Sequence, residues 1–528
     1  MTAPTARSDT TDPTASPEYP DPTASPSSWR AGRRMALDMT IVAGVLSMVA
    51  IGAIVGIARN VPLGWDEAVY ATMARSIVTD IPASTGGAIY RPPGLAVIGA
   101  AATAPFGLAD ASLRVVTLVL GLLSLAAIWA LARTVWDPVA AVIAVVTVSG
   151  APIVLDQIAR FHTDLPSTGL LLVLMALCWH EFERRPEPGR LLLAAAPLAA
   201  LAFYLRYGTV VAIGGIGLTA MLLWRRQMLR RWRHVAATLG LTILLLLPHI
   251  AEAMVLTGSP VGIIRSASAQ VNTSGPFVAT VQYLRWIPRE LLQTLGTVLF
   301  IAGGVFAAVT AGAAVTAVTA ARRRTLTTHA RRCIWLYLPA AITVVGLVLT
   351  SHAEPRYVLF PVVLGLIAGA GSVTVAVRWA KRQPCLAGRG RTIDRALSGG
   401  IVLAIGLVGF LDAQRAIALH RAAEPDRWLV ETGQAIRADA GGSCVIATTF
   451  PSIVGWYAAC EGIRFEREDV ALVTPVGGRA YVMFTDADPR RATAARIQLH
   501  RQLVAASGAT RLSTEDVSHP VEVYRLEP

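Results

Sequence analysis

Charged residues are scarce in this chain, and lysine is nearly absent from it. Only 15% of the 528 residues are charged and 54% are hydrophobic, which excludes an ordinary soluble globular protein. Lys381 is the single lysine, so arginine carries almost all of the positive charge behind the net +13. The arginines lie in short clusters between apolar segments, where they act as topology signals. We therefore predict an integral membrane protein, with the lipid bilayer as a partner and no nucleic acid.

Cysteine is also scarce, since the chain contains only five cysteines. Cys178, Cys333 and Cys385 lack the spacing of metal ligands. Cys444 and Cys460 lie in one polar region near the end of the chain. Two interpretations stay open for this pair, a disulfide in an exported domain or two free buried thiols.

Long apolar segments make up most of the remainder. The tail at residues 1–34 is rich in Pro, Ser, Thr and Asp, and we expect it to be disordered and cytoplasmic. The segment from Met35 to Ala58 is too long for a removable signal sequence and has no clear cleavage site, so it predicts an uncleaved first span. We expect about eleven spans, at roughly residues 36–58, 111–133, 137–155, 164–181, 190–207, 208–224, 235–256, 291–320, 333–350, 356–378 and 397–412.

The apolar segment from Pro92 to Leu108 decides the predicted topology. It is short, begins with two prolines and is rich in Ala and Gly. If it crossed the membrane, every later loop would change sides. A re-entrant or surface-lying helix instead places the arginine clusters near residues 184, 225, 231, 323, 331 and 378 in the cytoplasm, as the positive-inside rule requires. The N-terminus is then cytoplasmic, and the outer loops are 59–110, 156–164, 257–290 and 351–356, together with everything after about residue 413.

An acidic pair in the sequence Gly64-Trp65-Asp66-Glu67-Ala68-Val69-Tyr70 follows the first span. Such a pair can simply belong to a solvated loop. Further ionisable residues fall on the same outer face, however, and these are expensive to keep at a membrane boundary. Interfacial snorkelling explains any one arginine but not the whole group. We therefore predict a common site that contains Asp66, Asp164, Arg206 and Arg356.

The chemistry of such a site depends on what is available outside the cytoplasm. No nucleotide supplies activated sugar there, so a transferase needs a donor that the lipid phase delivers, and polyprenyl-phosphate sugars form that class. Arginines at the interface suit the donor phosphate through charge-assisted hydrogen bonds and stabilise it as it leaves. An aspartate can take the proton of the acceptor hydroxyl during attack.

The first outer loop resembles that of the GT-C fold glycosyltransferases, in particular the group of protein mannosyltransferases and aminoarabinose transferases. In that group an Asp-Glu-x-x-Tyr element, here Asp66 to Tyr70, precedes a Lys-Pro-Pro-like element, here Tyr90-Arg91-Pro92-Pro93. The resemblance covers roughly residues 36 to 380. Its later motifs are Thr163-Asp164-Leu165-Pro166, Arg206 before Tyr207-Gly208, and Arg356-Tyr357.

The resemblance implies an inverting glycosyltransferase with a GT-C transmembrane domain, here residues 35–412, that uses a polyprenyl-phosphate sugar. It implies Asp66 as the catalytic base and Asp164 as a second carboxylate that orients the acceptor or supports the site. Glu67 and Tyr70 are expected mainly to brace the loop, with substrate contact as the alternative. The full set implied for the donor phosphate and substrate is Glu67, Tyr70, Arg91, Arg206, Arg356 and Tyr357.

One departure from that group concerns metal binding. Aminoarabinose transferases carry a metal-holding glutamate just before the basic residue of the Lys-Pro element, and this chain has Tyr90 there. The change argues against lipid A as the acceptor. His162, His249 and His352 could ligate an ion, but a lone His near a helix end is usually a hydrogen-bonded structural residue. We therefore assign no metal or cofactor, and a divalent metal stays as the alternative.

Residues 413–528 have the composition of a small soluble domain. Ser443–Thr448, Tyr481–Thr485 and Val521–Arg525 are expected to be strands, and Arg490–Ala506 an amphipathic helix. These elements predict an extracytoplasmic α/β domain. The polar loop from Thr257 to Glu290 is interpreted either as a lid that orders on donor binding or as an ordinary mobile connection.

Three classes of function are compatible with this sequence. The favoured one is transfer of a sugar, at the outer face of the cell membrane, to a hydroxyl of a protein, a cell-envelope glycan or a lipid. The second is a transporter or lipid flippase, which many spans with buried ionisable residues also fit. The sequence shows no internal repeat and its ionisable residues gather at one face, which favours the transferase. The third is an inactive GT-C-like partner protein.

Overall fold

The structure is a computed structural model of the chain and describes residues 26–59, 61–84, 90–184, 189–271, 276–286, 328–350, 354–382, 426–464, 478–485, 509–514 and 517–526. Short described pieces also lie within 300–305, 396–418 and 498–505. Most of the predicted tail at residues 1–34 lies outside the described residues. The same is true of most of the expected span 291–320 and of most of the expected helix Arg490–Ala506, whereas more than half of the expected span 397–412 is described, as short helical pieces.

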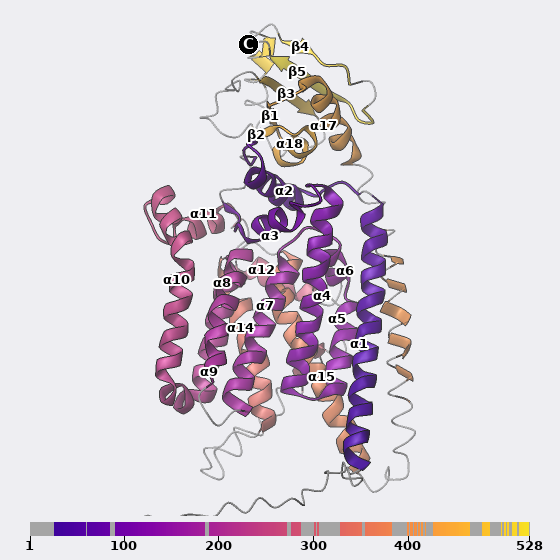
Figure 1. Cartoon of the computed structure of the whole chain (residues 1–528), viewed down its shortest axis with the longest axis vertical. Helices are drawn as coiled ribbons and strands as arrows, with labels where there is room; N and C mark the ends of the chain where they lie inside the picture. The colour runs from indigo at the N-terminus through magenta and orange to yellow at the C-terminus, as the bar shows by residue number, and fades with distance from the viewer. Residues whose placement is uncertain are drawn as a thin grey trace, which may run out of the picture.

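Three layers follow one another along the long axis of the molecule (Figure 1). Long helices form a bundle, and α2 (Trp65–Val78) and α3 (Gly94–Thr103) lie at its upper end. A small sheet domain that contains the C-terminus covers these two helices. The bundle helices are α1 (Pro26–Ala58), α4 (Asp110–Val135), α5 (Pro138–Ser149), α6 (Pro152–Ile158), α7 (Asp164–Trp179), α8 (Ala195–Leu205), α9 (Thr209–Arg230), α10 (Trp232–Thr257), α14 (Thr328–Thr350) and α15 (Leu359–Arg382).

The prediction of a multispanning helical membrane protein is confirmed. Among the described residues, 7 helices are long and apolar enough to cross a membrane, and each coincides with one of the expected spans. The expected span 137–155 is the pair α5 and α6, which is bent by 74° at a break, and the expected span 190–207 is a shorter apolar helix. The segment from Pro92 to Leu108 contains only α3, whose 10 residues are too few to cross. At about 1.5 Å per residue, such a helix spans about half of the ~30 Å hydrocarbon layer.

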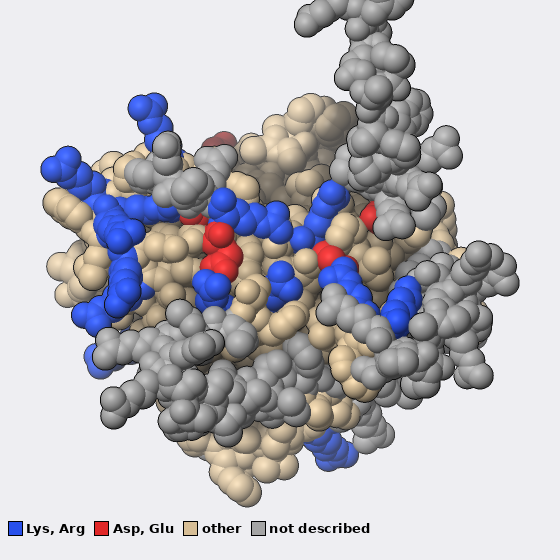
Figure 2. Space-filling view, turned by 90° about the horizontal axis from the view of Figure 1, so that it is seen from below, with Lys and Arg blue, Asp and Glu red and all other residues tan. Residues whose placement is uncertain are grey.

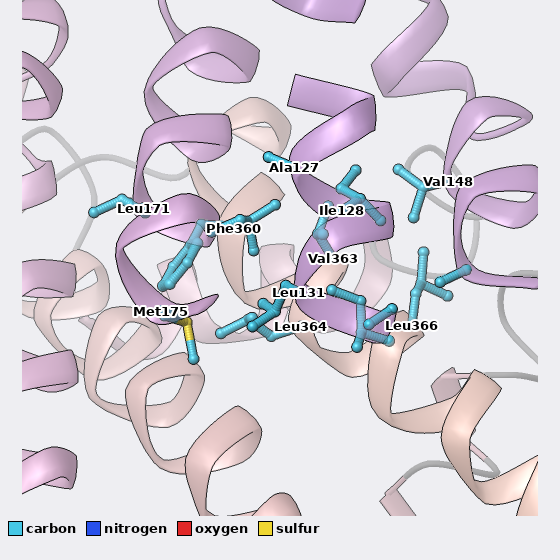
Figure 3. Close-up of a cluster of buried hydrophobic side chains, with 14 of the residues drawn as sticks. Ala127, Ile128, Leu131, Val148, Leu171, Met175, Phe360, Val363, Leu364 and Leu366 are labelled. Carbon is cyan, nitrogen blue, oxygen red and sulfur yellow. The ribbon is translucent and has the colours of Figure 1, made fainter. Parts of the chain in front are cut away.

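The centre of the bundle is a dry apolar core where α4, α5, α7 and α15 meet (Figure 3). Ile128 and Leu131 of α4 and Leu364 of α15 are fully buried in it. Lipid tails are as apolar as these side chains, so close backbone approach matters more than hydrophobic burial here. Gly169 of α7 provides such an approach, because an added Cβ would lie 2.3 Å from Oγ of Ser124 on α4. In contrast, α10 lies at the margin of the bundle, and only 11% of its apolar 18-residue stretch is buried.

Arginines gather at the end of the bundle away from the sheet domain (Figure 2). Several of them pair with acids and so tie neighbouring helix ends together. Arg331 pairs with Glu183 at 3.1 Å, and Arg378 pairs with Asp137, the N-cap of α5, at 3.0 Å. The exposed arginines at this end include Arg184, Arg225, Arg226, Arg230, Arg233 and Arg378.

The sheet domain contains a five-stranded sheet in the order β2-β1-β3-β5-β4. The first three strands in this order are parallel and the last two are antiparallel to their neighbours. Strands β1, β3 and β5 coincide with the three expected strands, so the predicted C-terminal α/β fold is confirmed. The elements are α17 (Arg427–Ala440), β1 (Cys444–Thr448), α18 (Pro451–Ala458), β2 (Glu461–Arg464), β3 (Arg479–Thr485), β4 (Thr510–Arg511) and β5 (Val521–Leu526).

The expected loop from Thr257 to Glu290 contains two helices, α11 (Gly262–Val271) and α12 (Pro276–Trp286). Residues 272–275 between them and 287–290 after them lie outside the described residues. Side chains from α8, α10 and α11 pack together here, through Phe203, Ala253 and Ile263. Whether this region acts as a lid stays a prediction.

Candidate active site

Five segments bring the candidate residues to the end of the bundle that faces the sheet domain. Asp66 and Glu67 lie in the first turn of α2, and Arg91 lies in the short connection to α3. Asp164 is the first residue of α7, and Arg206 is the C-cap of α8. Arg356 and Tyr357 lie in the 3-10 turn η5 (Pro355–Val358) that opens α15.

Asp66 is held between two arginines from distant parts of the chain. It forms an ion pair with Arg91, and its Oδ2 lies 2.5 Å from Nη2 of Arg356. Arg356 also donates from Nε to Glu354 at 2.6 Å. Burial alone would raise the pKa of Asp66, but the charges of Arg91 and Arg356 outweigh it and hold this pKa well below its usual range. The carboxylate is therefore ionised and poorly basic while both arginines stay bound to it.

Glu67, the adjacent residue, has an entirely different environment. Its side chain is 1% exposed and accepts hydrogen bonds from the Arg114 side chain and from the backbone N–H groups of Gly64 and Phe161. Burial alone would raise the pKa of Glu67, but Arg114 lowers it to about 2. Arg114 in turn donates to the carbonyls of Val61 and Pro62. This network closes the loop before α2, so the geometry favours a bracing role for Glu67.

Tyr70 also lies inside the packed loop and is 3% exposed. Its ring meets that of Phe161 edge to face, with centroids 6.4 Å apart. Like Glu67, it has the surroundings of a bracing residue.

Asp164 and Arg206 form a second ion pair beside the first. Asp164 is buried, whereas the Arg206 side chain is 21% exposed. The guanidinium of Arg206 lies over the ring of Tyr357, 4.3 Å from its centroid, and that of Arg356 lies 5.7 Å from the same centroid. Tyr357 thus contacts two guanidinium groups, and such cation–π contacts stabilise a cation that is partly removed from water. The two ion pairs form one charged cluster.

His162 completes this cluster and is neutral. Burial and the positive charge of Arg356 lower the pKa of His162 to about 4. Its Nδ1 lies 3.3 Å from Nη1 of Arg356, which can donate to it, and 3.4 Å from Nε2 of Gln157. This contact gives His162 a structural partner in place of a metal.

The described residues do not fit a bound divalent cation. Within them, no group of three His, Cys, Asp or Glu side chains converges to hold a metal ion. Asp66 and Asp164 already pair with arginines, and His249 lies apart from the site, among the rings of Phe203 and Tyr207. His352 lies outside the described residues.

Sequence reasoning missed several residues that shape the site. Arg114 is the most important of them, and its signal was an arginine within the first turns of an otherwise apolar span, which is expensive unless it is paired. Arg75 and Asp110 were also missed, and both contact the sheet domain. Cys444 and Cys460 form a disulfide in that domain, with their Cα atoms 4.7 Å apart.

Comparisons with known proteins agree with this geometry. The family model of dolichyl-phosphate-mannose-protein mannosyltransferases matches residues 90–251, a segment that includes Arg91, Asp164 and Arg206. Two structures of ArnT from Cupriavidus metallidurans, one bound to undecaprenyl phosphate and one in the apo state, superpose with TM-scores of 0.62 and 0.60 at 14% sequence identity. Each comparison covers 91% of this chain and 97% of ArnT.

A more distant likeness is to the Archaeoglobus fulgidus oligosaccharyltransferase in complex with Zn and sulfate. The TM-score is 0.52 at 13% identity, and the match covers 79% of this chain and 62% of that chain. A comparison with curated protein sequences finds no significant match. The chain therefore has the fold of the GT-C glycosyltransferases, and its residues 90–251 are similar in sequence to the protein mannosyltransferases.

Proposed function

We propose that this chain is an inverting glycosyltransferase that moves a sugar from a polyprenyl-phosphate sugar to an acceptor hydroxyl. The observation that carries the proposal is the position of Asp66 between Arg91 and Arg356 at one end of a membrane-spanning bundle. A carboxylate provides a base, and the arginines provide a site for the donor phosphate. The bound undecaprenyl phosphate in the ArnT structure supports a lipid-linked donor here.

The arginines supply the electrostatic part of the proposed reaction. Arg91, Arg206 and Arg356 come from three different segments and have side chains that are 33%, 21% and 17% exposed, so a ligand can still reach them. Guanidinium groups bind phosphate oxygens in a fixed fork geometry. They would also stabilise the negative charge that develops on the phosphate as the glycosidic bond breaks.

Donor binding would also activate Asp66. In the described state the two arginines keep its pKa low, and a carboxylate with a low pKa is a weak base. A donor phosphate that binds Arg91 and Arg356 competes with Asp66 for both of them. Asp66 then loses its two cationic partners while its side chain stays only 12% exposed, so its pKa rises toward a value that suits a base.

The chemical step is a single displacement at the anomeric carbon. Asp66 takes the proton of the acceptor hydroxyl, whose oxygen forms the new bond from the face opposite the phosphate. The bond from the anomeric carbon to the phosphate oxygen breaks, and the phosphate leaves with the electron pair. Configuration at this carbon is inverted. Asp164 keeps Arg206 in place through their ion pair and so acts as a supporting carboxylate.

The position of the site supports the outer face of the cell membrane as its location. Most of the exposed arginines among the described bundle helices lie at the opposite end, seen in Figure 2, which the positive-inside rule assigns to the cytoplasm. The sheet domain and the site would then lie outside. The ionisable residues at the site form one cluster at a single end of the bundle, which favours a transferase over a transporter with a pathway through it.

Replacement of Asp66 by Asn tests the proposal, because it removes the base and keeps the shape of the side chain. We expect wild-type membranes to transfer label from radiolabelled polyprenyl-phosphate sugars, and Asp66→Asn to transfer at least about 100-fold less. Binding of polyprenyl phosphate, measured by its Kd, should be retained in the variant.

Asp156→Asn is the matched control, since Asp156 lies at the same end of the bundle and pairs at 3.2 Å with Arg160, which is not one of the three proposed donor-binding arginines. It should transfer normally. Equal transfer by wild type and Asp66→Asn would remove Asp66 from the mechanism. Failure of the wild type with every donor would contradict the transferase and favour a transporter or an inactive partner.

A further inference from the structure

The sheet domain makes its closest contact with the membrane part through the short helix α18, which lies against α2. This contact matters because α2 carries Asp66 in its first turn. Ser84 lies in the loop after α2. Its hydroxyl donates at 3.3 Å to the carbonyl of Pro451, which is the first residue of α18. The opposite end of α18 meets Arg75, in the last turn of α2.

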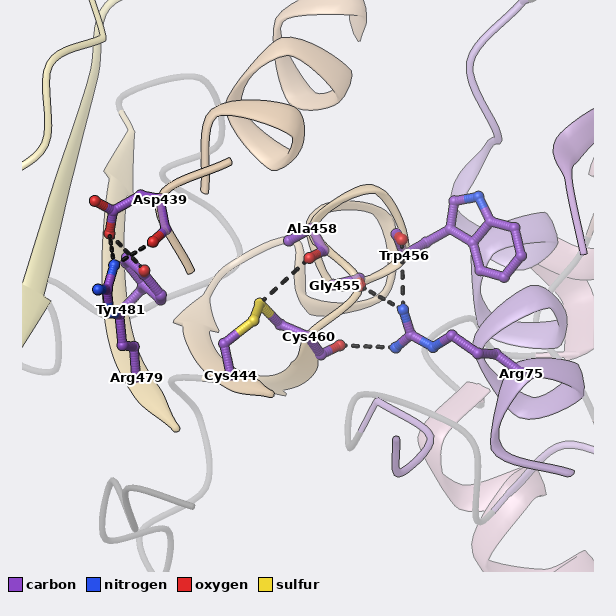
Figure 4. The surroundings of a disulfide bond; sticks show 9 residues. All are labelled: Arg75, Asp439, Cys444, Gly455, Trp456, Ala458, Cys460, Arg479 and Tyr481. Atoms are coloured by element: carbon purple, nitrogen blue, oxygen red, sulfur yellow. Dashed lines mark hydrogen bonds and ion pairs between the residues drawn. A yellow bond between two sulfur atoms is a disulfide. The ribbon is translucent and has the colours of Figure 1, made fainter. Parts of the chain in front are cut away.

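Arg75 binds the carbonyl end of α18 (Figure 4). Its Nη1 donates to the carbonyl of Gly455 at 2.8 Å, and its Nη2 donates to that of Cys460 at 2.7 Å. Gly455 lies in the last turn of α18, where the carbonyls carry partial negative charge, and Cys460 lies just beyond this helix, so a guanidinium is well suited to this position. Arg75 is 5% exposed, and burial lowers its pKa only to about 10, so it remains charged at neutral pH.

Further contacts tie the same domain to the residues on either side of Asp66. Asp110, at the start of α4, accepts from Nε1 of Trp456 at 2.6 Å and from the hydroxyl of Tyr457 at 2.5 Å. The Tyr457 hydroxyl also accepts from the backbone N–H of Leu63 at 2.9 Å. The guanidinium of Arg464 lies 5.2 Å from the ring centroid of Trp65, the residue before Asp66.

The disulfide closes the loop that makes these contacts. It joins Cys444, the first residue of β1, to Cys460, just beyond α18, across a sequence separation of 16. The carbonyl of Cys460 is itself one of the two closest acceptors for Arg75. The bond therefore joins the start of β1 to the chain segment on which α2 rests (Figure 4).

We propose that Arg75 is a positioning residue that anchors α2, and with it Asp66, on the disulfide-closed loop of the sheet domain. The inference rests on the proposed sugar transfer, with Asp66 as its base. A base must lie within hydrogen-bond reach of the proton it removes, and a displacement of about 1 Å can cost about 100-fold in rate. The sheet domain thus contributes to catalysis through α2, without a group of its own at the site.

Arg75→Met removes the guanidinium and keeps much of the apolar volume. We expect kcat to fall at least about tenfold while the KM for the donor changes less than about twofold, because the donor-binding arginines lie on other segments. Hydrogen exchange of the α2 amides should rise at least about tenfold.

Tyr481→Phe is the control, because it removes a buried hydrogen bond to Asp439 in the same domain, on the other side of the disulfide loop from Arg75 (Figure 4). It should leave kcat and the exchange of α2 unchanged. Unchanged α2 exchange in Arg75→Met would overturn the anchor, and faster exchange with normal kcat would overturn the positioning role. Loss of transfer in the wild type would contradict only the proposed function, because the exchange measurement needs no turnover.

The double variant Cys444→Ala/Cys460→Ala tests the disulfide without touching any group that Arg75 binds, since the carbonyl at position 460 remains. It should reproduce the fall in kcat and the faster α2 exchange of Arg75→Met, at an unchanged donor KM. Wild-type kcat together with wild-type exchange in this folded variant would show that closure of the loop is not needed.

Discussion

At the scale of single residues, Asp66 and Glu67 show how neighbours in sequence acquire different roles. They point about 100° apart on a helix, so one meets arginines that a ligand can reach and the other meets the buried Arg114. In the proposed reaction, a donor phosphate separates Asp66 from Arg91 and Arg356. The Glu67 contacts include two backbone N–H groups, which do not move without unfolding the loop.

The Glu67 network makes a prediction about stability and pH. The pKa of Glu67 is lowered from 4.5 to about 2, so its contribution to stability is fully present above pH 4.5 and is lost as the pH falls toward 2. We expect Glu67→Gln to lower Tm by several degrees at pH 7. The difference between wild type and variant should shrink as the pH is lowered from about 5 toward 2.

Thermal unfolding of both proteins in the same detergent, followed across this pH range, gives the measurement. Glu461→Gln is the control, because burial raises the pKa of Glu461, so its ionised form gains no stability from the fold. A Tm difference for Glu67→Gln that stayed constant down to pH 2 would contradict the assigned ion pair.

At the scale of the elements, helix contacts in the bundle depend on small residues. α4 and α7 approach each other closely at Gly169, where Ser124 of α4 occupies the space that a side chain on α7 would need. Asp164 is the first residue of α7, and Arg114 lies on α4. The packing of α4 against α7 therefore also sets the distance between Asp164 and Arg114.

Gly169→Ala should therefore separate α4 from α7 and destabilise the protein by about 1–3 kcal/mol. Tm measured in detergent would fall, and the rate of sugar transfer should fall with it. Gly217→Ala on α9 is the matched control, since an added Cβ there meets nothing within 4 Å, and it should leave Tm unchanged or slightly raised. An unchanged Tm in Gly169→Ala would contradict the close packing of these two helices.

At the scale of the whole molecule, charge is divided between two ends. The end away from the sheet domain carries exposed arginines, and the other carries the paired cluster around Asp66 (Figure 2). This division predicts the orientation in the membrane, with the sheet domain outside the cytoplasm.

Single cysteines in a background without Cys178, Cys333 and Cys385 test this orientation. We expect Ser513→Cys, on the sheet domain, to react with a membrane-impermeant maleimide in intact cells. Arg226→Cys, at the arginine end, should react only after the cells are made permeable. Both positions are exposed, so reactivity reports the side of the membrane. The reverse pattern would contradict the proposed location of the site.

Much of this architecture could be predicted from local patterns. Long apolar segments identified the spans, because a helix must satisfy its own backbone groups in lipid. The two prolines and short length of the segment after Arg91 correctly separated α3 from the spans. Short apolar runs located β1 and β3, and apolar residues at alternate positions located β5. Arg114 and Arg75 escaped notice because each looks like an ordinary interfacial arginine until its partner, 47 or 380 positions away in the chain, is known.

The sequence by itself determined that the chain spans a membrane, that its C-terminal part is an α/β domain, and which ionisable residues gather at one end of the helix bundle. These features follow from hydrophobicity and charge, which act over a few turns of chain. Only the tertiary structure decided that Asp66 lies between Arg91 and Arg356, that Glu67 is buried against Arg114, and that Cys444 bonds Cys460, whose carbonyl accepts from Arg75. Such contacts join segments far apart in sequence, and they depend on how the helices pack, which no local pattern records.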